Sequence, residues 1–494
     1  MHAHSARLYV AESVRELERR AIEICGIPGY ELMHRAAMAA WAGLCAHWPA
    51  ARRITVVAGP GNNGGDGYEL ARLARAAGCE VQVVSVGGLP RQGDAVAACA
   101  NWHAQGGVSH SWSGALPLAD VVVDALFGLG LSRVPEGDVA AAIEAIRAAR
   151  GTGCGVLALD LPSGLDATRG VALGTAVEAD LTVTFIGDKL GLHTADGPDY
   201  SGHVIAATLE VPEAAYEGVA AAALRLEPEE LRAAMPRRRR SAHKNRHGHV
   251  LLVGGNRGMG GATLLAARAA LRCGAGLVSV ATHPAHAAAL TAAQPELMCH
   301  GVTDASELES LLARANAVAI GPGLGQDAWA RGLWACACAA GLPLIVDADA
   351  LNLLAEHAVP LPGDAVLTPH PGEAARLLGL DSGAAVQGAR LAAVHALRTR
   401  YGGAVVLKGA GTLIAGQKVW LCPYGNPGMA VAGMGDVLTG IIVALRAQGL
   451  TAEASARCGV LIHALAGDRA AQSGQRGLLP SDLIEALREQ VNSA

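Results

Sequence analysis

The sequence predicts an α/β protein with two domains. Apolar strands alternate with helical patterns, which is typical of a parallel sheet covered by helices on both faces. Two such series occur, and an Ala- and Arg-rich stretch separates them. The 494 residues exceed one ordinary core, and 51% hydrophobic with 17% charged residues indicates well-buried domains. We place a first domain at residues 1–215, a linker at 216–240 and a second domain at 241–494.

The first series opens with helical patterns in residues 11–48 and a buried strand at Arg53–Ala58. The glycine-rich segment Gly59–Gly67 follows, and Tyr68–Ala77 has helical spacing. We interpret this segment as a loop whose glycines allow a diphosphate or ribose to approach the backbone; a cluster at a helix N-terminus is the alternative. The later elements are strands at Glu80–Val86, Asp120–Leu126, Gly155–Asp160 and Asp180–Phe185, with a helix near 136–149.

The presumed linker carries four consecutive arginines, Arg237–Arg240. A basic run can bind nucleic acid, but no aromatic residue interleaves it and the whole chain has a formal charge of -5. We therefore favour a solvated linker or a site for ligand phosphates, and we expect no nucleic-acid partner.

The second series ends its strands in polar or glycine-rich turns. In open α/β sheets, ligands bind beyond the carboxyl ends of the strands, so these turns predict a nucleotide-sized site. No Walker loop of the form GxxxxGK[ST] occurs. The predicted strands are His249–Gly255, Leu277–Ala281, Ala317–Ile320, Leu344–Asp347, Ala365–Thr368 and Ala404–Leu407, and a helix is predicted at Ala262–Cys273.

The segment Gly425–Gly440 is a glycine-rich loop that leads into an apolar run at Val437–Leu445, long enough for a buried helix. Gly433 and Gly435 allow the backbone to wrap an anion, and a helix start would offer it free N–H groups. Asp436 stands at the mouth of this site, where it could take a proton from a hydroxyl that attacks phosphorus. An acidic residue that complements the helix dipole is the alternative.

The sequence composition bears on the cellular location of the protein. The N-terminus has no apolar signal core, and no apolar run reaches the roughly 18–20 residues of a membrane helix. The eleven cysteines show no zinc-ligand spacing. We expect a cytoplasmic protein with no membrane partner, reduced cysteines, and helices whose alanine content leaves room for a homo-oligomer.

Four motifs of the first domain resemble the NAD(P)H-hydrate epimerase domain, which has a Rossmann-like, three-layer fold. They are Asn62–Gly67, Asp124–Gly130, Asp160–Asp166 and Thr184–Lys189.

Six motifs of the second domain resemble the NAD(P)H-hydrate dehydratase domain, of ribokinase-like α/β fold: Leu251–Gly261, Gly321–Gly325, Asp347–Asn352, Thr368–Glu373, Lys408–Thr412 and Gly425–Gly440. Their order and spacing are similar to those of the fused bacterial repair enzymes, and the resemblance covers nearly the whole chain.

The resemblance implies repair of damaged NADH and NADPH. The first domain would interconvert the R and S hydrates, and the second would dehydrate the S form with ADP as phosphoryl donor, releasing AMP and phosphate. The choice between ADP and ATP cannot be read from the spacing.

In the first domain the resemblance implies a K⁺ ion held by Asn63, Asp124 and Ser163, whose oxygens are hard ligands. Leu129 stands where the family usually has a polar residue. The implied substrate-binding residues are Asn62, Asn63, Gly64, Gly65, Asp66, Gly128, Leu129, Gly130, Leu131, Ser132, Arg133, Val134 and Asp160. Asp160 ends a buried strand and is our candidate acid–base group, with Lys189 stabilising developing charge. A structural ion pair is the alternative for both.

In the second domain the resemblance implies hydrate contacts from Ala262, Gly323, His370 and Asp436, and nucleotide contacts from Lys408, Gly409, Ala410, Gly411, Thr412 and Gly435. Asp436 is the candidate base. His370 alone would fit a histidine satisfied at a strand end. Phosphoryl transfer predicts Mg²⁺, but no carboxylate cluster identifies its ligands; Glu373 is a possible indirect one.

Two rival functions remain at this point. A vitamin or sugar kinase of ribokinase-like fold, fused to a nucleotide-binding domain, would share the Gly435–Asp436 site but would leave the Asn62–Gly67 domain unexplained. An interaction module that had kept only the fold would be expected to lose Asp160, Lys408 or Asp436, and all three are present.

Overall fold

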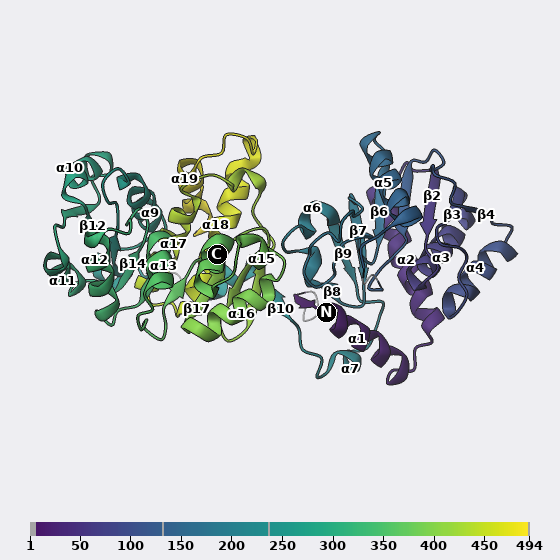
Figure 1. Cartoon of the computed structure of the whole chain (residues 1–494), viewed down its shortest axis with the longest axis horizontal. Helices are drawn as coiled ribbons and strands as arrows, with labels where there is room; N and C mark the ends of the chain where they lie inside the picture. Colours follow the sequence, from purple (N-terminus) through teal and green to yellow (C-terminus); the bar gives the residue numbers. More distant parts are fainter. Residues whose placement is uncertain (1–5, 131–132, 236–237, 493–494) are drawn as a thin grey trace. The chain divides into compact units, whose positions relative to one another are not determined.

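The computed structural model describes residues 6–130, 133–235 and 238–492. The chain divides into two compact units, Met1–Leu224 and Arg225–Ala494 (Figure 1). Both are α/β units, which confirms the predicted fold class. The division falls inside the predicted linker, residues 216–240. No helix within the described ranges is long and apolar enough to cross a membrane.

The first unit is built on a seven-stranded parallel sheet of order β4-β3-β2-β5-β6-β7-β9. Apolar runs such as Val121–Ala125 are buried along their whole length, because helices cover both faces. The strands are β2 (Arg53–Ala58), β3 (Glu80–Ser85), β4 (Ser109–Ser111), β5 (Val121–Ala125), β6 (Gly155–Leu159), β7 (Leu181–Phe185) and β9 (His203–Ala207).

Two buried clusters show which helices cover this sheet. Helices α1 to α4 contribute to the larger cluster and α5 to the smaller one. The helices are α1 (Ala11–Glu23), α2 (Gly29–His47), α3 (Asn62–Ala76), α4 (Asp94–Ala104), α5 (Gly137–Gly151), α6 (Gly197–Ser201) and α7 (Glu213–Tyr216). A small side sheet places β1 (Arg7–Tyr9) between β8 (Asp188–Lys189) and β10 (Ala223–Arg225).

One prediction for this unit is wrong. The segment Gly59–Gly67 is not a loop throughout, because α3 begins at Asn62. Three of its glycines, including Gly64 and Gly65, are buried in the first turns of the helix: a Cβ on Gly64 would lie 1.9 Å from the carbonyl oxygen of Gly59, and one on Gly65 would meet Met33. Tight packing at the start of a helix requires small residues there, and those residues hide the apolar period that normally reveals a helix.

In the second unit, seven parallel strands are followed by two antiparallel ones, in the order β13-β12-β11-β14-β15-β16-β17-β18-β19. The parallel strands are β11 (His249–Val253), β12 (Leu277–Thr282), β13 (Met298–Gly301), β14 (Ala317–Ile320), β15 (Leu344–Val346), β16 (Val366–Leu367) and β17 (Ala404–Leu407). The antiparallel pair is β18 (Thr412–Ala415) and β19 (Val419–Cys422).

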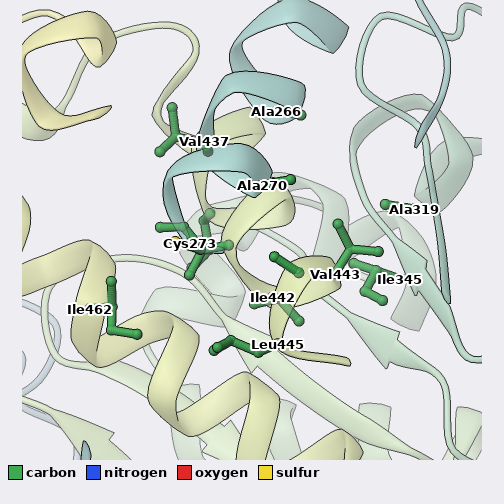
Figure 2. Close-up of a cluster of buried hydrophobic side chains, with 14 of the residues drawn as sticks. Ala266, Ala270, Cys273, Ala319, Ile345, Val437, Ile442, Val443, Leu445 and Ile462 are labelled. Carbon is green, nitrogen blue, oxygen red and sulfur yellow. The ribbon is translucent and has the colours of Figure 1, made fainter. Parts of the chain in front are cut away.

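The core of this unit centres on α17 (Met434–Ala447), whose apolar run is buried almost completely. Ala266 and Ala270 of α9 and Val437 of α17 belong to this core and are labelled in Figure 2. Leu231 of α8 also belongs to this core. The helices are α8 (Glu229–Ala234), α9 (Gly260–Arg272), α10 (Pro284–Ala293), α11 (Ala305–Leu312), α12 (Ala328–Ala339), α13 (Ala348–Glu356), α14 (Pro371–Leu378), α15 (Gly383–Gln387), α16 (Arg390–Tyr401), α17, α18 (Ala452–Ala470) and α19 (Pro480–Gln490).

Candidate active sites

The first unit contains a cavity of about 430 Å³ beyond the carboxyl ends of β2, β5 and β6. This is the edge at which parallel α/β sheets bind ligands. Eight of the predicted residues line this cavity, although they come from separate parts of the chain: Asn62, Asn63, Asp66, Gly128, Leu129, Gly130, Asp160 and Lys189.

The other predicted residues of this unit lie elsewhere. Gly64 and Gly65 pack inside the unit and do not line the cavity. Arg133 and Val134 are exposed and also stand outside the lining. Leu131 and Ser132 lie outside the described residues.

Asp160 and Lys189 form a buried ion pair on the cavity wall. The Nζ of Lys189 donates to Oδ1 of Asp160 and, at 2.9 Å, to the carbonyl oxygen of Phe185. Lys189 is fully buried, whereas Asp160 keeps 8% of its surface exposed. Asp160 also has φ of +66°, a strained value for a residue with a side chain. The carboxylate is therefore held at the cavity with one oxygen engaged and its backbone in a conformation that is retained where function needs it.

Gly128 explains how the cavity reaches this carboxylate. A Cβ at Gly128 would lie 2.9 Å from Oδ2 of Asp160. Only glycine leaves this second oxygen of Asp160 accessible.

Two charged residues of the cavity lining come from α1 and were not predicted from the sequence. Arg15 donates to the carbonyl oxygen of Leu129 at 2.5 Å, and Glu18 faces the same space as Asp66 and Asp160. Burial and the charge of Asp160 raise the pKa of Glu18, and burial, Asp160 and Glu18 raise that of Asp66. No motif marks α1, whose charges follow the pattern of an ordinary amphipathic helix.

The predicted K⁺ ligands Asp124 and Ser163 lie together at the ends of β5 and β6. Ser163 donates to Asp124 from Oγ at 2.7 Å and from its backbone N–H at 2.8 Å. Burial raises the pKa of Asp124 to about 6. Asn63 is buried, and its amide oxygen and nitrogen have no hydrogen-bond partner among the described residues. A buried carboxylate without a counter-charge and an unpaired amide oxygen fit a hard monovalent cation.

In the second unit, the turns after β15, β16 and β17 meet at the start of α17. Nζ of Lys408 lies 2.8 Å from Oδ1 of Asp347 and 3.8 Å from Oε2 of Glu373. Thr439 of α17 donates to Oδ2 of Asp347 at 2.7 Å. Burial alone would lower the pKa of Lys408, but Asp347 and Glu373 outweigh it and raise that pKa. The sequence singled out three of these positions but not Thr439, which lies in the apolar run.

Asp436 occupies the first turn of α17. Burial and the neighbouring Asp347 raise its pKa to about 7, against the opposing effect of Lys408. Gly433 precedes the helix with φ of +96°, as predicted, whereas Gly435 lies within the helix and has no positive φ. Gly435 instead provides space: a Cβ there would stand 3.3 Å from Nζ of Lys408.

His370 has a structural role as well as a place at this edge. Its Nδ1 accepts from the N–H groups of Gly372 and Glu373, and Glu373 accepts from the N–H of His370 at 2.7 Å. This reciprocal pair caps α14. Half of the imidazole side chain stays exposed, so the ring can cap the helix and still meet a ligand.

The remaining predicted residues fall into two groups. Gly323 and Ala262 are neighbours, since a Cβ on Gly323 would lie 3.2 Å from that of Ala262. The turn 408–412, which includes Gly409, Ala410, Gly411 and Thr412, is held by Arg390. This arginine donates to the carbonyl oxygens of Lys408 and Gly411 in the turn and to that of the preceding Leu407. Arg390 is buried and was not predicted; an arginine on an ordinary helix carries no sequence signal.

Within the described ranges, no group of three or more His, Cys, Asp or Glu residues has the arrangement of a metal site. Asp347 and Glu373 are both engaged by Lys408. Mg²⁺ is commonly held by one or two carboxylates together with substrate phosphates, and the carboxylates of Asp436 and Glu373, which influence each other's charge, fit an ion that arrives with a nucleotide.

Both halves of the chain match known families. Residues 250–489 match the NAD(P)H-hydrate dehydratase family, and residues 29–191 match the family described as YjeF-related protein N-terminus. The bifunctional NAD(P)H-hydrate repair enzyme of Coxiella burnetii is 47% identical over 98% of this chain and 99% of its own.

Solved structures resemble the second unit. A ribokinase-like superfamily protein from Enterococcus faecalis is 33% identical, covers 55% of this chain and 95% of its own, and has a TM-score of 0.51. An ADP/ATP-dependent NAD(P)H-hydrate dehydratase from Bacillus subtilis, co-crystallised with ATP and Mg²⁺, is 29% identical over 53% of this chain and 96% of its own, with a TM-score of 0.48. The full-length match, together with the two family matches, shows that this chain belongs to the bifunctional NAD(P)H-hydrate repair enzymes.

Proposed function

We propose that this chain repairs hydrated NADH and NADPH in two steps. The first unit interconverts the R and S hydrates, and the second dehydrates the S hydrate while converting ADP to AMP and phosphate. The observation that carries the proposal is the chemical contrast between the two sites. One is a cavity with four carboxylates and one lysine, suited to proton transfer, and the other joins a lysine to a carboxylate at a helix start.

In the first unit, Asp160 exchanges the proton that accompanies opening and closing of the hydrate at its carbinolamine carbon. Lys189 stabilises the charge that develops during this step. Because Oδ2 of Asp160 faces the cavity past Gly128, it can reach a bound ring without movement of the backbone. A cavity of about 430 Å³ lies within the range of small-molecule sites.

Asn63, Asp124 and Ser163 would hold the K⁺ ion. When bound, K⁺ supplies a fixed positive charge that neutralises the buried carboxylate of Asp124 and orients the oxygens around it. Two observations support this K⁺ site: the amide of Asn63 has no hydrogen-bond partner among the described residues, and the pKa of Asp124 is raised.

In the second unit, Asp436 takes the proton from the C6 hydroxyl of the hydrate as that oxygen attacks the β-phosphorus of ADP. The bond from phosphorus to the bridging oxygen breaks and AMP leaves. The electron pair of the ring nitrogen then expels phosphate from C6, and loss of a ring proton restores the double bond. A carboxylate whose pKa lies near 7 is matched to this proton transfer at neutral pH.

Lys408 and the backbone of 409–412 would hold the nucleotide phosphates, with Gly435 leaving room beside the ammonium group. Mg²⁺ carried by the nucleotide supplies positive charge that offsets the charge on the transferring phosphoryl group. Ala262, Gly323 and His370 would contact the hydrate.

The test is an absorbance assay on the full chain with an R,S mixture of NADH hydrate. With ADP or ATP, we expect complete recovery of the near-ultraviolet absorption of reduced nicotinamide. Recovery that stops when the S form is consumed would show an inactive first unit, and no recovery would contradict the dehydratase. A small-molecule kinase fused to a binding domain would give no recovery at all. The nucleotide that supports the faster rate identifies the donor.

We also propose that the chain works in the cytoplasm as a homo-oligomer. The eleven free cysteines support a reducing compartment. Light scattering of the purified chain measures the assembly, and a monomer at micromolar concentration would contradict it.

A further inference from the structure

We propose that the second unit has a separate binding site for a small anion carrying several phosphates. The site is a groove of about 1180 Å³, which we call the arginine groove. Its lining includes five arginines: Arg238, Arg239, Arg246, Arg272 and Arg488. The arginine groove therefore includes part of the arginine run, to which the proposed repair reaction assigns no role.

All charged side chains in the lining of the groove are basic. None of its lining residues is an Asp or a Glu. Arg272 pairs with Glu485, which lies outside the lining, and Arg238 donates to the carbonyl oxygen of Gly274 and to Gln448. Burial and the charge of Arg238 lower the pKa of His247 in the same groove.

Three arginines of the groove remain available to a ligand. Among the described residues, no carboxylate lies within ion-pair distance of Arg239, Arg246 or Arg488, and all three side chains belong to exposed residues. Guanidinium groups gathered without counter-charge repel one another, and an anion that bridges them relieves this repulsion.

The helix dipole explains only some of these charges. Arg272 and Arg488 lie in the last turns of α9 and α19, where cations complement the negative helix end. Arg239 and Arg246 belong instead to the segment before β11, where no α-helix ends on them. Their presence in the groove therefore needs another reason.

The shape and the remaining lining favour a small ligand over nucleic acid. Leu271, Leu445 and Leu450 provide apolar surface, while Gln448, Thr451 and Asn492 provide hydrogen-bonding groups. Among the described residues, no Phe, Tyr or Trp lines the groove to stack bases, and the chain is acidic overall. The volume suffices for a nucleotide-sized polyphosphate.

The groove is distinct from the dehydratase site. Leu445 and Gln448 lie at the far end of α17 from Asp436, and twelve residues of helix span roughly 18 Å. Likewise Ala262 lies at the start of α9 and Cys273 just after its end. Figure 2 shows Cys273 and Leu445, two of the groove residues, at this end of the helix pair.

The test measures binding of inorganic tripolyphosphate to the full chain by titration calorimetry, in a Lys408→Met background that removes the cation of the dehydratase site. We expect binding to persist there and to weaken at least about tenfold when Arg239→Ser, Arg246→Ser and Arg488→Ser are added, since each exposed charge pair contributes modestly. The control adds Arg91→Ser, Arg314→Ser and Arg331→Ser, which remove the same charge from exposed positions outside the groove. Here we expect a change below about twofold.

With Lys408 intact, the groove triple variant should keep the KM of the dehydratase for ADP, because its substitutions lie at the opposite helix ends. Absence of tripolyphosphate binding in the Lys408→Met protein would overturn the proposal. Equal weakening in the two triple variants would do so too, because it would show a general charge effect. If a single-stranded oligonucleotide binds the groove at a lower concentration than tripolyphosphate does and displaces it, the proposed small-anion ligand is wrong and the groove binds nucleic acid.

Discussion

The ammonium group of Lys408 lies 2.8 Å from Oδ1 of Asp347, while Thr439 holds the other oxygen of the same carboxylate at 2.7 Å. This bridge ties the end of β17 to the first turns of α17, on which Asp436 stands. Asp347 thereby acts on two neighbours: it pairs with Lys408, and its charge raises the pKa of Asp436. Asp347 can exert both effects without touching a ligand.

Asp347→Asn is predicted to move the pH profile of dehydration. The substitution removes a negative charge beside Asp436, so the pKa of Asp436 falls below about 7 and the base is ionised at lower pH. The rising limb of log kcat against pH should shift to lower pH, and the KM for ADP should rise because Lys408 loses its anchor. Asp349→Asn is the control and should shift the limb less, since Asp349 raises the pKa of Asp436 more weakly. An unmoved limb in Asp347→Asn would refute this coupling.

Asp436→Asn is predicted to lose dehydratase turnover by about 10²–10⁴-fold, the usual contribution of a general base. Binding of ADP should persist, because Lys408 and the 408–412 turn are intact. Single-turnover assays with the S hydrate and calorimetry with ADP measure the two properties. Turnover close to that of the unmodified chain would remove Asp436 as the base.

Asp160→Ala is predicted to abolish exchange between R and S hydrates while the S hydrate is still dehydrated. It also leaves the buried ammonium of Lys189 without its partner, at a cost of about 3–5 kcal/mol in the free energy of unfolding. Asp160→Asn keeps the shape and a hydrogen-bond acceptor for Lys189 but not its counter-charge, so this matched variant should be destabilised less than Asp160→Ala. Chiral chromatography of the hydrates follows the exchange; normal exchange in Asp160→Asn would rule out acid–base catalysis by this carboxylate.

K⁺ is predicted to stabilise the first unit near neutral and alkaline pH only. The folded pKa of Asp124, about 6, exceeds the ordinary value of 3.8, so without a cation the folded state gains stability as pH falls through about 6. K⁺ requires the ionised carboxylate and should raise the melting temperature at about pH 8 but not at about pH 5. Melting in KCl against choline chloride measures this, and Asp124→Asn should lose the difference. An equal shift in that variant would place the ion elsewhere.

His370 permits a test of its two roles. His370→Ala removes the cap of α14 and should cost about 0.5–2 kcal/mol of stability, whereas His370→Asn keeps a capping side chain. If the ring contacts the hydrate, both variants should raise the KM for the S hydrate. A KM that changes only together with stability, in His370→Ala alone, would show that the residue is a cap and no more.

Much of the fold followed from the sequence because its signals are local. Buried strands such as Arg53–Ala58 are continuous apolar runs, and the predicted bounds of that strand are those of β2. The start of α3 was missed because its helical turn is made of residues chosen for close packing against Gly59 and Met33, which have no helical signature. A local sequence pattern does not predict a helix start where packing against residues distant in the sequence determines which residue fits.

The sequence by itself determined the two α/β units, the motif residues at the strand ends and the family. Only the tertiary structure decided that Glu18 and Arg15 of α1 join the Asp160 cavity, that Thr439 and Lys408 both bind Asp347, and that Arg390 supports the 408–412 turn. It also gathered the arginines of three separate segments into one groove. The reason is physical: a motif records chemistry between neighbours in the chain, whereas pKa values, ion pairs and cavities depend on distances that exist only after folding.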